Sequence, residues 1–310
     1  CFIGIPCITA YNVLASIFRG MGDSRSPMYF IAAACVVNIG LDFFFMGALR
    51  LGPAGAALGT TLSQAVSVLL ALCVILKRKS IRLSKSDFCP RKATMKDILS
   101  IGLPVAAQDG FIQVSFMLIT IMANQRGLTD AAAVGIVEKI ISFLFLVPSS
   151  MLSTVSALGA QNIGAGKYDR VDDILRYAIA IGVGFGAVMA LLMQFIAPSM
   201  VRPFTSDEAV VKAGAAYIRS YIFDCLFAGI QFSFSGYFCA WGRSGLSFLH
   251  NTLSILLVRV PGAWLACRFF PQTLVPMGLA PACGSLFSSI VCVLLYRWMK
   301  RQNKPTGNKD

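Results

Sequence analysis

Long apolar stretches separated by short polar turns run the length of the chain. A membrane-spanning helix needs about 20 predominantly apolar residues, and nine stretches meet that requirement. Gly and Pro recur inside them, as is common in membrane helix bundles. The pattern therefore predicts an all-α integral membrane protein. The nine expected spans are residues 1–18, 28–49, 55–76, 98–123, 132–158, 174–198, 212–239, 246–267 and 277–298.

Composition excludes the other broad classes. Hydrophobic residues make up 56% of the 310 residues and charged residues only 13%, against roughly 25% charged residues in a typical soluble domain. A soluble fold of this size could not bury so much apolar surface, and a disordered chain would need the opposite bias. Both classes are therefore excluded.

The net charge of +13 reports topology. When the 27 basic residues are assigned to alternating sides of the membrane, 19 fall on one side and five on the other, and three lie within spans. The positive-inside rule places the richer side in the cytoplasm. We expect a multi-pass protein of the plasma (inner) membrane with a cytoplasmic C-terminus, in contact with lipid and without a nucleic-acid partner.

Cysteine and histidine give no sign of a metal or disulfide framework. The ten cysteines are dispersed, nine of them in apolar stretches, and no CxxC pair occurs. A single histidine, His250, removes any His-rich zinc site. We expect the cysteines to act as small packing residues, and we expect no metal and no cofactor.

An internal repeat relates the two ends of the chain. RGMGDSRSP (19–27) resembles CAWGRSGLS (239–247), and GTTLSQAV (from Gly59) resembles GSLFSSIV (from Gly284). The offsets of 220 and 225 residues are nearly equal, which indicates parallel repeats. Six spans follow the basic break at 77–97 and only three precede it. With Cys as first residue, this pattern leads us to expect a fragment that lacks three N-terminal spans.

Five motifs carry a family resemblance. Their order and spacing resemble the multidrug and toxic compound extrusion family, whose fold has twelve helices in two lobes. The resemblance implies that about nine of those helices, the fourth to the twelfth, are present here. The motifs are RGMGDSRSP (19–27), NIGLD (38–42), GPAGAALGTTLSQ (52–64), IGLPVAA (101–107) and GAQNIGAGKYD (159–169).

The resemblance also implies a domain plan. We expect residues 1–80 to form the second half of the N-lobe (helices 4–6) and 81–97 a cytoplasmic linker. Residues 98–300 would form the C-lobe (helices 7–12), and 301–310 a cytoplasmic tail.

Family members are secondary antiporters, so the resemblance implies an activity. A monomer would export small organic cations or amphipathic molecules in exchange for H⁺ or Na⁺, by rocking between outward-open and inward-open states. No GxxxxGK[ST] phosphate loop occurs, in keeping with a transporter that does not use ATP.

Asp42 is the leading candidate for ion coupling, because a charge inside a span is costly. It lies one helical turn after Asn38, so the two side chains share a face. Thr60 on the next helix could complete a set of oxygen ligands suited to Na⁺ or to proton exchange, and Ala56 could lend its carbonyl. The resemblance implies that these positions form a cation network with an Asp on the first helix. The alternative is a polar knot that locks the helices.

Asp109 and Gln113 are candidates for the cavity. Pro104 can bend their helix and turn both side chains towards a cavity, where Asp109 would attract cations. Some sodium-coupled family members carry a Glu near Gln113, and its absence speaks against a sodium site there. The alternative for Asp109 is a helix-end charge near the lipid headgroups.

Glu138 and Asp224 are further acids within spans. Glu138 either faces the cavity or is a polar position inside the bundle. Asp224 follows Tyr221 and has Arg219 and Arg259 as possible ion partners, so it is either a cavity residue or part of a structural pair.

Three other functions are weaker. A lipid-linked oligosaccharide flippase of related architecture would line its cavity with basic residues, whereas the spans hold four acids and three bases. A membrane-embedded enzyme would need a catalytic set, and neither HExxH nor GxSxG occurs, so we expect no enzyme. A passive channel does not account for the two-lobe repeat.

Overall fold

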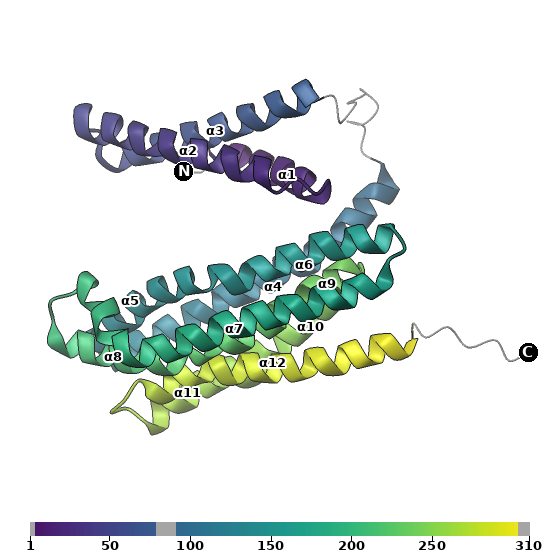
Figure 1. The fold of residues 1–310 in the computed structure, drawn as a ribbon. Coiled ribbons are helices and arrows are strands. Elements are labelled where there is room, and N and C mark those ends of the chain that lie inside the picture. The colour runs from purple at the N-terminus through teal and green to yellow at the C-terminus, as the bar shows by residue number, and fades with distance from the viewer. Residues whose placement is uncertain (1–3, 79–90, 303–310) are drawn as a thin grey trace, which may run out of the picture. The chain divides into compact units, whose positions relative to one another are not determined.

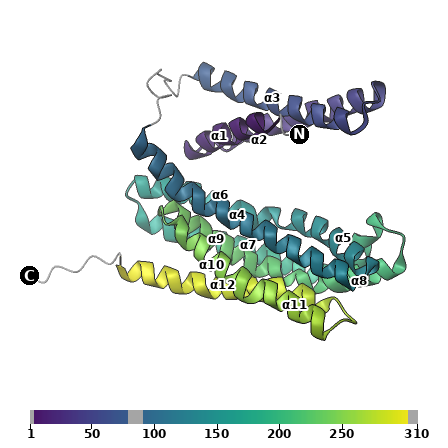
Figure 2. The same ribbon diagram turned by 180° about the vertical axis from the view of Figure 1, so that it is seen from behind.

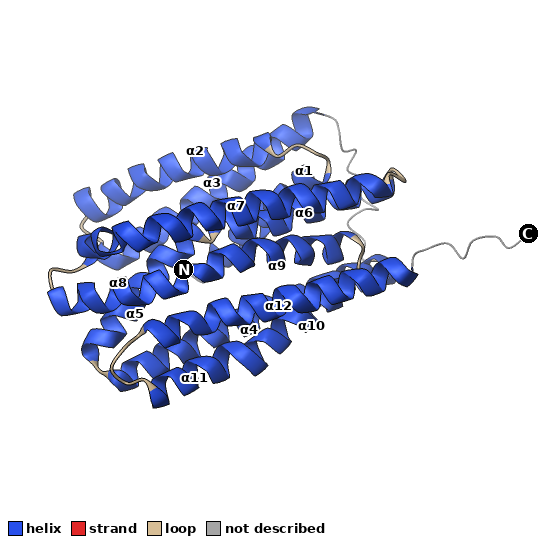
Figure 3. Ribbon diagram, turned by 60° about the horizontal axis from the view of Figure 1, so that its bottom comes forward, coloured by secondary structure: helices blue, strands red, loops and turns tan. Residues whose placement is uncertain are grey.

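The computed structural model describes residues 4–78 and 91–302, and every regular element in these ranges is a helix (Figure 3). Eight helical segments are long and apolar enough to cross a membrane, which confirms the predicted all-α membrane fold. They are Arg25–Ala48, Gly52–Lys77, Lys92–Arg126, Leu128–Gly164, Tyr168–Phe204, Glu208–Ala240, Ser244–Phe269 and Val275–Gln302.

The first of the nine predicted spans is the exception. The span expected at 1–18 corresponds to helix α1 (Ile5–Gly20), whose 16 residues are fewer than a span normally needs. Most of the linker expected at 81–97 and most of the tail expected at 301–310 lie outside the described residues. Helix α4 begins at Lys92, inside the stretch expected as linker.

The chain divides into two compact units, Cys1–Arg91 and Lys92–Asp310. Figures 1 and 2 show α1 to α3 in the first group of helices and α4 to α12 in the second. Each unit is described by itself below.

The first unit is a three-helix bundle. Helix α2 (Arg25–Asp42) continues as a π-helical segment, η2 (Phe43–Ala48), and α3 (Gly52–Arg78) packs against both α1 and α2. The buried side chains come from all three helices, and Phe18 packs edge-on against Phe30 with 5.5 Å between ring centres. The Tyr11 hydroxyl donates to the Pro27 carbonyl at 2.9 Å, which ties α1 to the start of α2.

The second unit contains the remaining helices. Several predicted spans consist of two or three helices joined end to end, such as α10, η5 and α11. The elements are α4 (Lys92–Arg126), α5 (Leu128–Leu144), α6 (Leu146–Gly164), α7 (Tyr168–Val201), η4 (Arg202–Phe204), α8 (Glu208–Tyr221), α9 (Phe223–Ala240), α10 (Ser244–Ser254), π-helical η5 (Ile255–Arg259), α11 (Val260–Phe269) and α12 (Val275–Gln302).

Helix α9 lies at the centre of this unit and packs against α6, α7 and α12. Glycine lets the backbones approach directly. A Cβ built on Gly182 of α7 would lie 2.9 Å from the Cα of Gly229, and one on Gly186 would lie 2.6 Å from the Cα of Leu226. Close backbone contact of this kind drives helix association in lipid.

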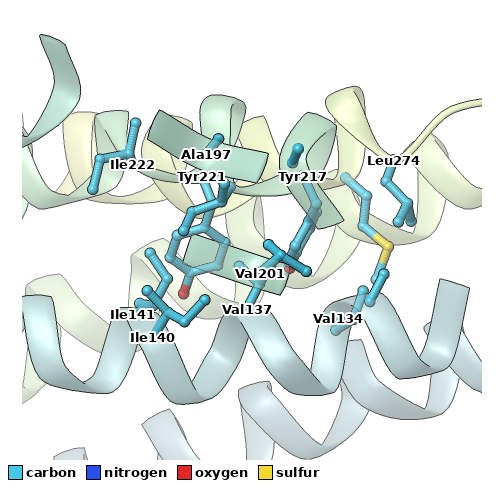
Figure 4. Close-up of a cluster of buried hydrophobic side chains, with 14 of the residues drawn as sticks. Val134, Val137, Ile140, Ile141, Ala197, Val201, Tyr217, Tyr221, Ile222 and Leu274 are labelled. Atoms are coloured by element: carbon cyan, nitrogen blue, oxygen red, sulfur yellow. The ribbon is translucent and has the colours of Figure 1, made fainter. Parts of the chain in front are cut away.

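A large apolar core fills the space beside these contacts, with residues from α4, α5, α7, α8, α9, α11 and α12. Figure 4 shows Tyr221 of α8 with its hydroxyl directed towards Ile140 and Ile141 of α5. Tyr217 and Tyr221 are almost fully buried and pack edge-on at 5.6 Å. This core fixes α8 beside α5, where the charged residues described below are found.

The contact between α7 and α9 can be tested with matched glycine variants. Gly186→Ala places a methyl group against the backbone of Leu226 and is expected to lower the free energy of unfolding by about 1–3 kcal/mol. Gly184→Ala is the control, because a Cβ there meets no other atom within 4 Å. Thermal unfolding of the purified protein in detergent measures both. Equal melting temperatures for the two variants would contradict the close approach.

Candidate functional site

The first unit places Asp42 against the backbone of α3. Asp42 is the last α-helical residue before η2, and it is half-buried. A Cβ built on Gly59 would overlap Oδ1 of Asp42. The missing side chain at Gly59 therefore makes the room that the carboxylate occupies. Short π-helical segments such as η2 are rare and occur frequently at functional sites.

Asn38 and Asp42 come together on one face of α2, as their spacing predicts. Nδ2 of Asn38 and Oδ1 of Asp42 are both shielded from solvent, and neither has a hydrogen-bond partner in the described part of the chain. An unsatisfied buried polar group costs about 1–3 kcal/mol. This face of α2 therefore favours anything that supplies the missing interactions, whether a cation, a proton or another polar group.

Thr60 and Ala56 interact with each other. The Thr60 hydroxyl donates to the Ala56 carbonyl within α3 at 3.0 Å, and Thr60 is exposed. The structure thus brings Asn38 and Asp42 to the side of α3 that carries Gly59. Thr60 follows Gly59 directly but forms its hydrogen bond within its own helix.

Asp109 and Gln113 both lie on the exposed side of α4. Their neighbour Gln108 is buried and accepts a 2.7 Å hydrogen bond from the Ser247 hydroxyl of α10. The polar residue that ties α4 into the second unit is therefore Gln108, whereas Asp109 and Gln113 stand outside that interior contact.

Glu138 and Asp224 lie near one buried base, Arg259. The half-buried Glu138 accepts a hydrogen bond from the Thr120 hydroxyl at 3.1 Å. Asp224 is fully buried, and neither of its carboxylate oxygens has a hydrogen-bond partner among the described residues. Arg259 acts on both acids through space.

Arg259 is itself held on two sides. Its Nη2 donates to the Tyr221 hydroxyl at 2.9 Å, and its Cζ lies 4.7 Å from the centre of the Phe116 ring. Of the two bases that the sequence offers as partners for Asp224, Arg259 is the one buried with it, and Arg219 is exposed.

A seam of buried hydroxyl groups joins α9, α10 and α12. His250 of α10 is bonded to Ser235 at 3.0 Å and to Ser288 at 2.7 Å. Farther along the seam, Ser254 donates to the Gly284 carbonyl at 2.6 Å. The sequence analysis missed this seam because isolated serines look neutral within apolar spans. Serines spaced three or four residues apart on α10 and α12 were the available signal.

Within residues 4–78 and 91–302, no three His, Cys, Asp or Glu side chains are grouped so as to hold a metal ion. The candidate residues therefore form two polar sites of different charge. One is built on Asp42 in the first unit, and the other is built on Arg259 and its two acids in the second.

Comparison with known proteins identifies the family. The MatE family model matches residues 104–265, which is more than half of the chain. The chain belongs to the MatE family. This confirms the resemblance to multidrug and toxic compound extrusion proteins inferred from the motifs.

Curated relatives of this MatE chain include three bacterial proteins. "Probable multidrug resistance protein YpnP" of Bacillus subtilis is 30% identical, with 96% of this chain and 66% of that protein covered. "Probable multidrug resistance protein NorM" of Thermotoga maritima is 23% identical, covering 93% and 64%. "Multidrug export protein MepA" of Staphylococcus aureus is 26% identical, covering 78% and 54%. The chain spans less than two thirds of the length of these relatives.

Solved structures confirm the two-lobe transporter fold predicted for this MatE chain. A MOP superfamily transporter from Pyrococcus furiosus superposes with a TM-score of 0.91 at 22% identity, covering 98% of this chain and 68% of that one. A mutant of the Vibrio cholerae MATE transporter VcmN gives a TM-score of 0.88 at 18% identity, covering 95% and 66%.

The contact between Gly59 and Asp42 leads to a test by mutant cycle. Gly59→Ala is expected to lower the melting temperature, because the new methyl group must displace the Asp42 carboxylate. Asp42→Ala in the same chain removes the overlapping oxygen and should restore part of the loss, so the two effects are not additive.

Gly40→Ala on α2 is the control, since a Cβ there meets no other atom within 4 Å. Thermal unfolding of the four purified variants, including the double variant, gives the coupling. Strictly additive effects of Gly59→Ala and Asp42→Ala would contradict the contact.

Proposed function

We propose that this chain belongs to a secondary active antiporter that exports cationic or amphipathic compounds in exchange for H⁺ or Na⁺. The observation that carries the proposal is the Asn38–Asp42 face of α2, with two unsatisfied polar atoms set against Gly59. The coupling ion binds at this face, and the protein alternates between outward-open and inward-open states as the ion and the substrate exchange.

The chemistry of the face suits a small cation. A shielded carboxylate oxygen has a strong need for positive charge in an apolar medium. A proton on Asp42 satisfies that need, and so does Na⁺, which takes oxygen ligands as other hard cations do. Thr60 and Ala56 lie a turn apart on the adjacent helix and complete the ligand set if the Thr60 hydroxyl turns away from the Ala56 carbonyl.

The substrate class rests on the relatives and on acidic side chains. Curated relatives carry names such as "multidrug resistance protein" and "multidrug export protein". In this chain, Asp109 and Gln113 lie on the exposed side of α4 and offer a polar surface to organic cations. Glu138 and Asp224 contribute from inside the second unit. No feature of the described residues favours the flippase alternative, whose substrate would call for several cavity-lining bases.

The setting of the proposed activity follows from charge and hydropathy. The protein acts as a monomer in the plasma membrane with its C-terminus in the cytoplasm, where the basic excess of the loops meets anionic lipid. It carries out transport and no chemical conversion, and it needs no cofactor besides the coupling ion.

Asp42→Asn tests the proposal in everted membrane vesicles that contain the complete protein. A proton or sodium gradient directed out of the lumen should drive ethidium into wild-type vesicles. The variant should reduce the initial rate to background, because the neutral amide cannot exchange a cation. Ethidium fluorescence follows the uptake, and immunoblotting matches the protein levels.

Glu208→Gln is the matched control, since Glu208 is an exposed acid at the start of α8 whose ion pair is with the exposed Arg202. Its uptake rate should equal that of the wild type. Wild-type uptake by Asp42→Asn under both gradients would refute the assignment of the coupling site.

A further inference from the structure

The two halves of the internal repeat place opposite charges against the same glycine. Gly59 and Gly284 begin the matching repeat segments GTTLSQAV and GSLFSSIV. A Cβ built on Gly59 meets the carboxylate of Asp42, and one built on Gly284 meets Cβ of Arg259 at 3.2 Å. Each unit thus sets a charged residue of the preceding span against the repeat glycine, an acid in the first unit and a base in the second.

The local backbone is similar at both positions. Asp42 is the residue immediately before η2, and Arg259 is the last residue of η5, so both stand at the edge of a π-helical segment. A π-helical turn re-aims the side chains that follow it within the span. In both units the re-aimed turn brings a charge to the facing helix.

Arg259 is fixed inside the second unit. Only 8% of its surface is exposed, and its guanidinium is held between the Tyr221 hydroxyl and the Phe116 ring. Cation–π contact with a desolvated ring and a hydrogen bond to a phenol both retain a positive charge at this place. The guanidinium cannot lose its proton in a protein. The second unit therefore carries a permanent internal cation.

The charged groups around Arg259 are Asp224 from α9 and Glu138 from α5, and Tyr217 and Tyr221 complete its surroundings from α8. Glu138 is half-buried and has the Thr120 hydroxyl as a donor. Asp224 is fully buried and has no hydrogen bond from any described residue. Asp224 thus depends on Arg259 for compensation of its charge.

We infer that Arg259 is a tethered counter-cation, which takes at Asp224 in the second unit the role that an exchangeable cation takes at Asp42 in the first. The inference rests on the proposed function for the role of Asp42. Because the guanidinium cannot leave, Asp224 takes up neither Na⁺ nor a proton during transport, and ion exchange is confined to the first unit. Arg259 is therefore a specificity-determining residue for ion coupling.

Removing the tethered charge should create a new cation site. Every variant is made in the Asp42→Asn background, which silences the first unit, and melting temperatures are compared in sodium chloride and in an equal concentration of N-methyl-D-glucamine chloride. Arg259→Met should gain a sodium-dependent rise of roughly 2–4 °C, because Na⁺ now compensates Asp224. Adding Asp224→Asn should abolish the rise. The Asp42→Asn parent should show none.

Arg219→Met is the matched control, since it removes the same charge from an exposed position on α8; it should leave the melting temperature equal in both salts. A variant with Arg259→Met that shows no sodium response would overturn the inference. So would a parent whose sodium response disappears on Asp224→Asn.

If Arg259→Met does not accumulate as folded protein, Asp224→Asn should rescue it, because the double variant is neutral at this place. Failure of that rescue would equally overturn the inference. These readouts do not involve transport, so the fate of the proposed function is decided separately, by ethidium uptake with Asp42→Asn.

Discussion

A charge inside the apolar membrane must be compensated, and this constraint organises the chain. The spans contain few ionisable residues, and each of the two best-buried sites handles its charge in a different way. In the first unit, the Asp42 carboxylate lies against Gly59 with one oxygen unsatisfied among the described residues. In the second, Arg259 is enclosed with Asp224 and supplies the compensating charge from the protein itself. The first arrangement leaves a place for a mobile cation, and the second fills it permanently.

Close helix packing makes both arrangements possible. The glycines of α7 and α9 bring backbones into direct contact, so the second unit forms a rigid frame around Arg259. The same residue type has another use at Gly59 and Gly284, where a missing side chain admits a charged group from the neighbouring span. Buried hydroxyls along α10 and α12 then satisfy one another, as in the bonds of His250 to Ser235 and Ser288. Small and weakly polar residues thus position the few charged ones.

Hydropathy predicted the spans well because the signal is long and local. Eight of nine were found, and α1 ended short of a full span. The pairing of Asn38 with Asp42 on one face followed from helical periodicity alone. Periodicity says nothing about which helix lies opposite, so the contact with Gly59 could not be predicted. The Thr60 hydroxyl was expected to turn towards Asp42, but a carbonyl of its own helix is always within reach and accepts its hydrogen bond. The choice of Arg259 over Arg219 likewise depended on tertiary burial.

The central claim is that ion exchange occurs at Asp42 and is excluded at Asp224. Ion release on substrate binding tests it most directly: ethidium is added to the purified complete protein, and protons are followed with a pH indicator and Na⁺ with a sodium electrode. The account predicts that the wild type and Asp224→Asn release the same amount of the coupling ion, and that Asp42→Asn releases none. Release that persists in Asp42→Asn and disappears in Asp224→Asn would contradict it.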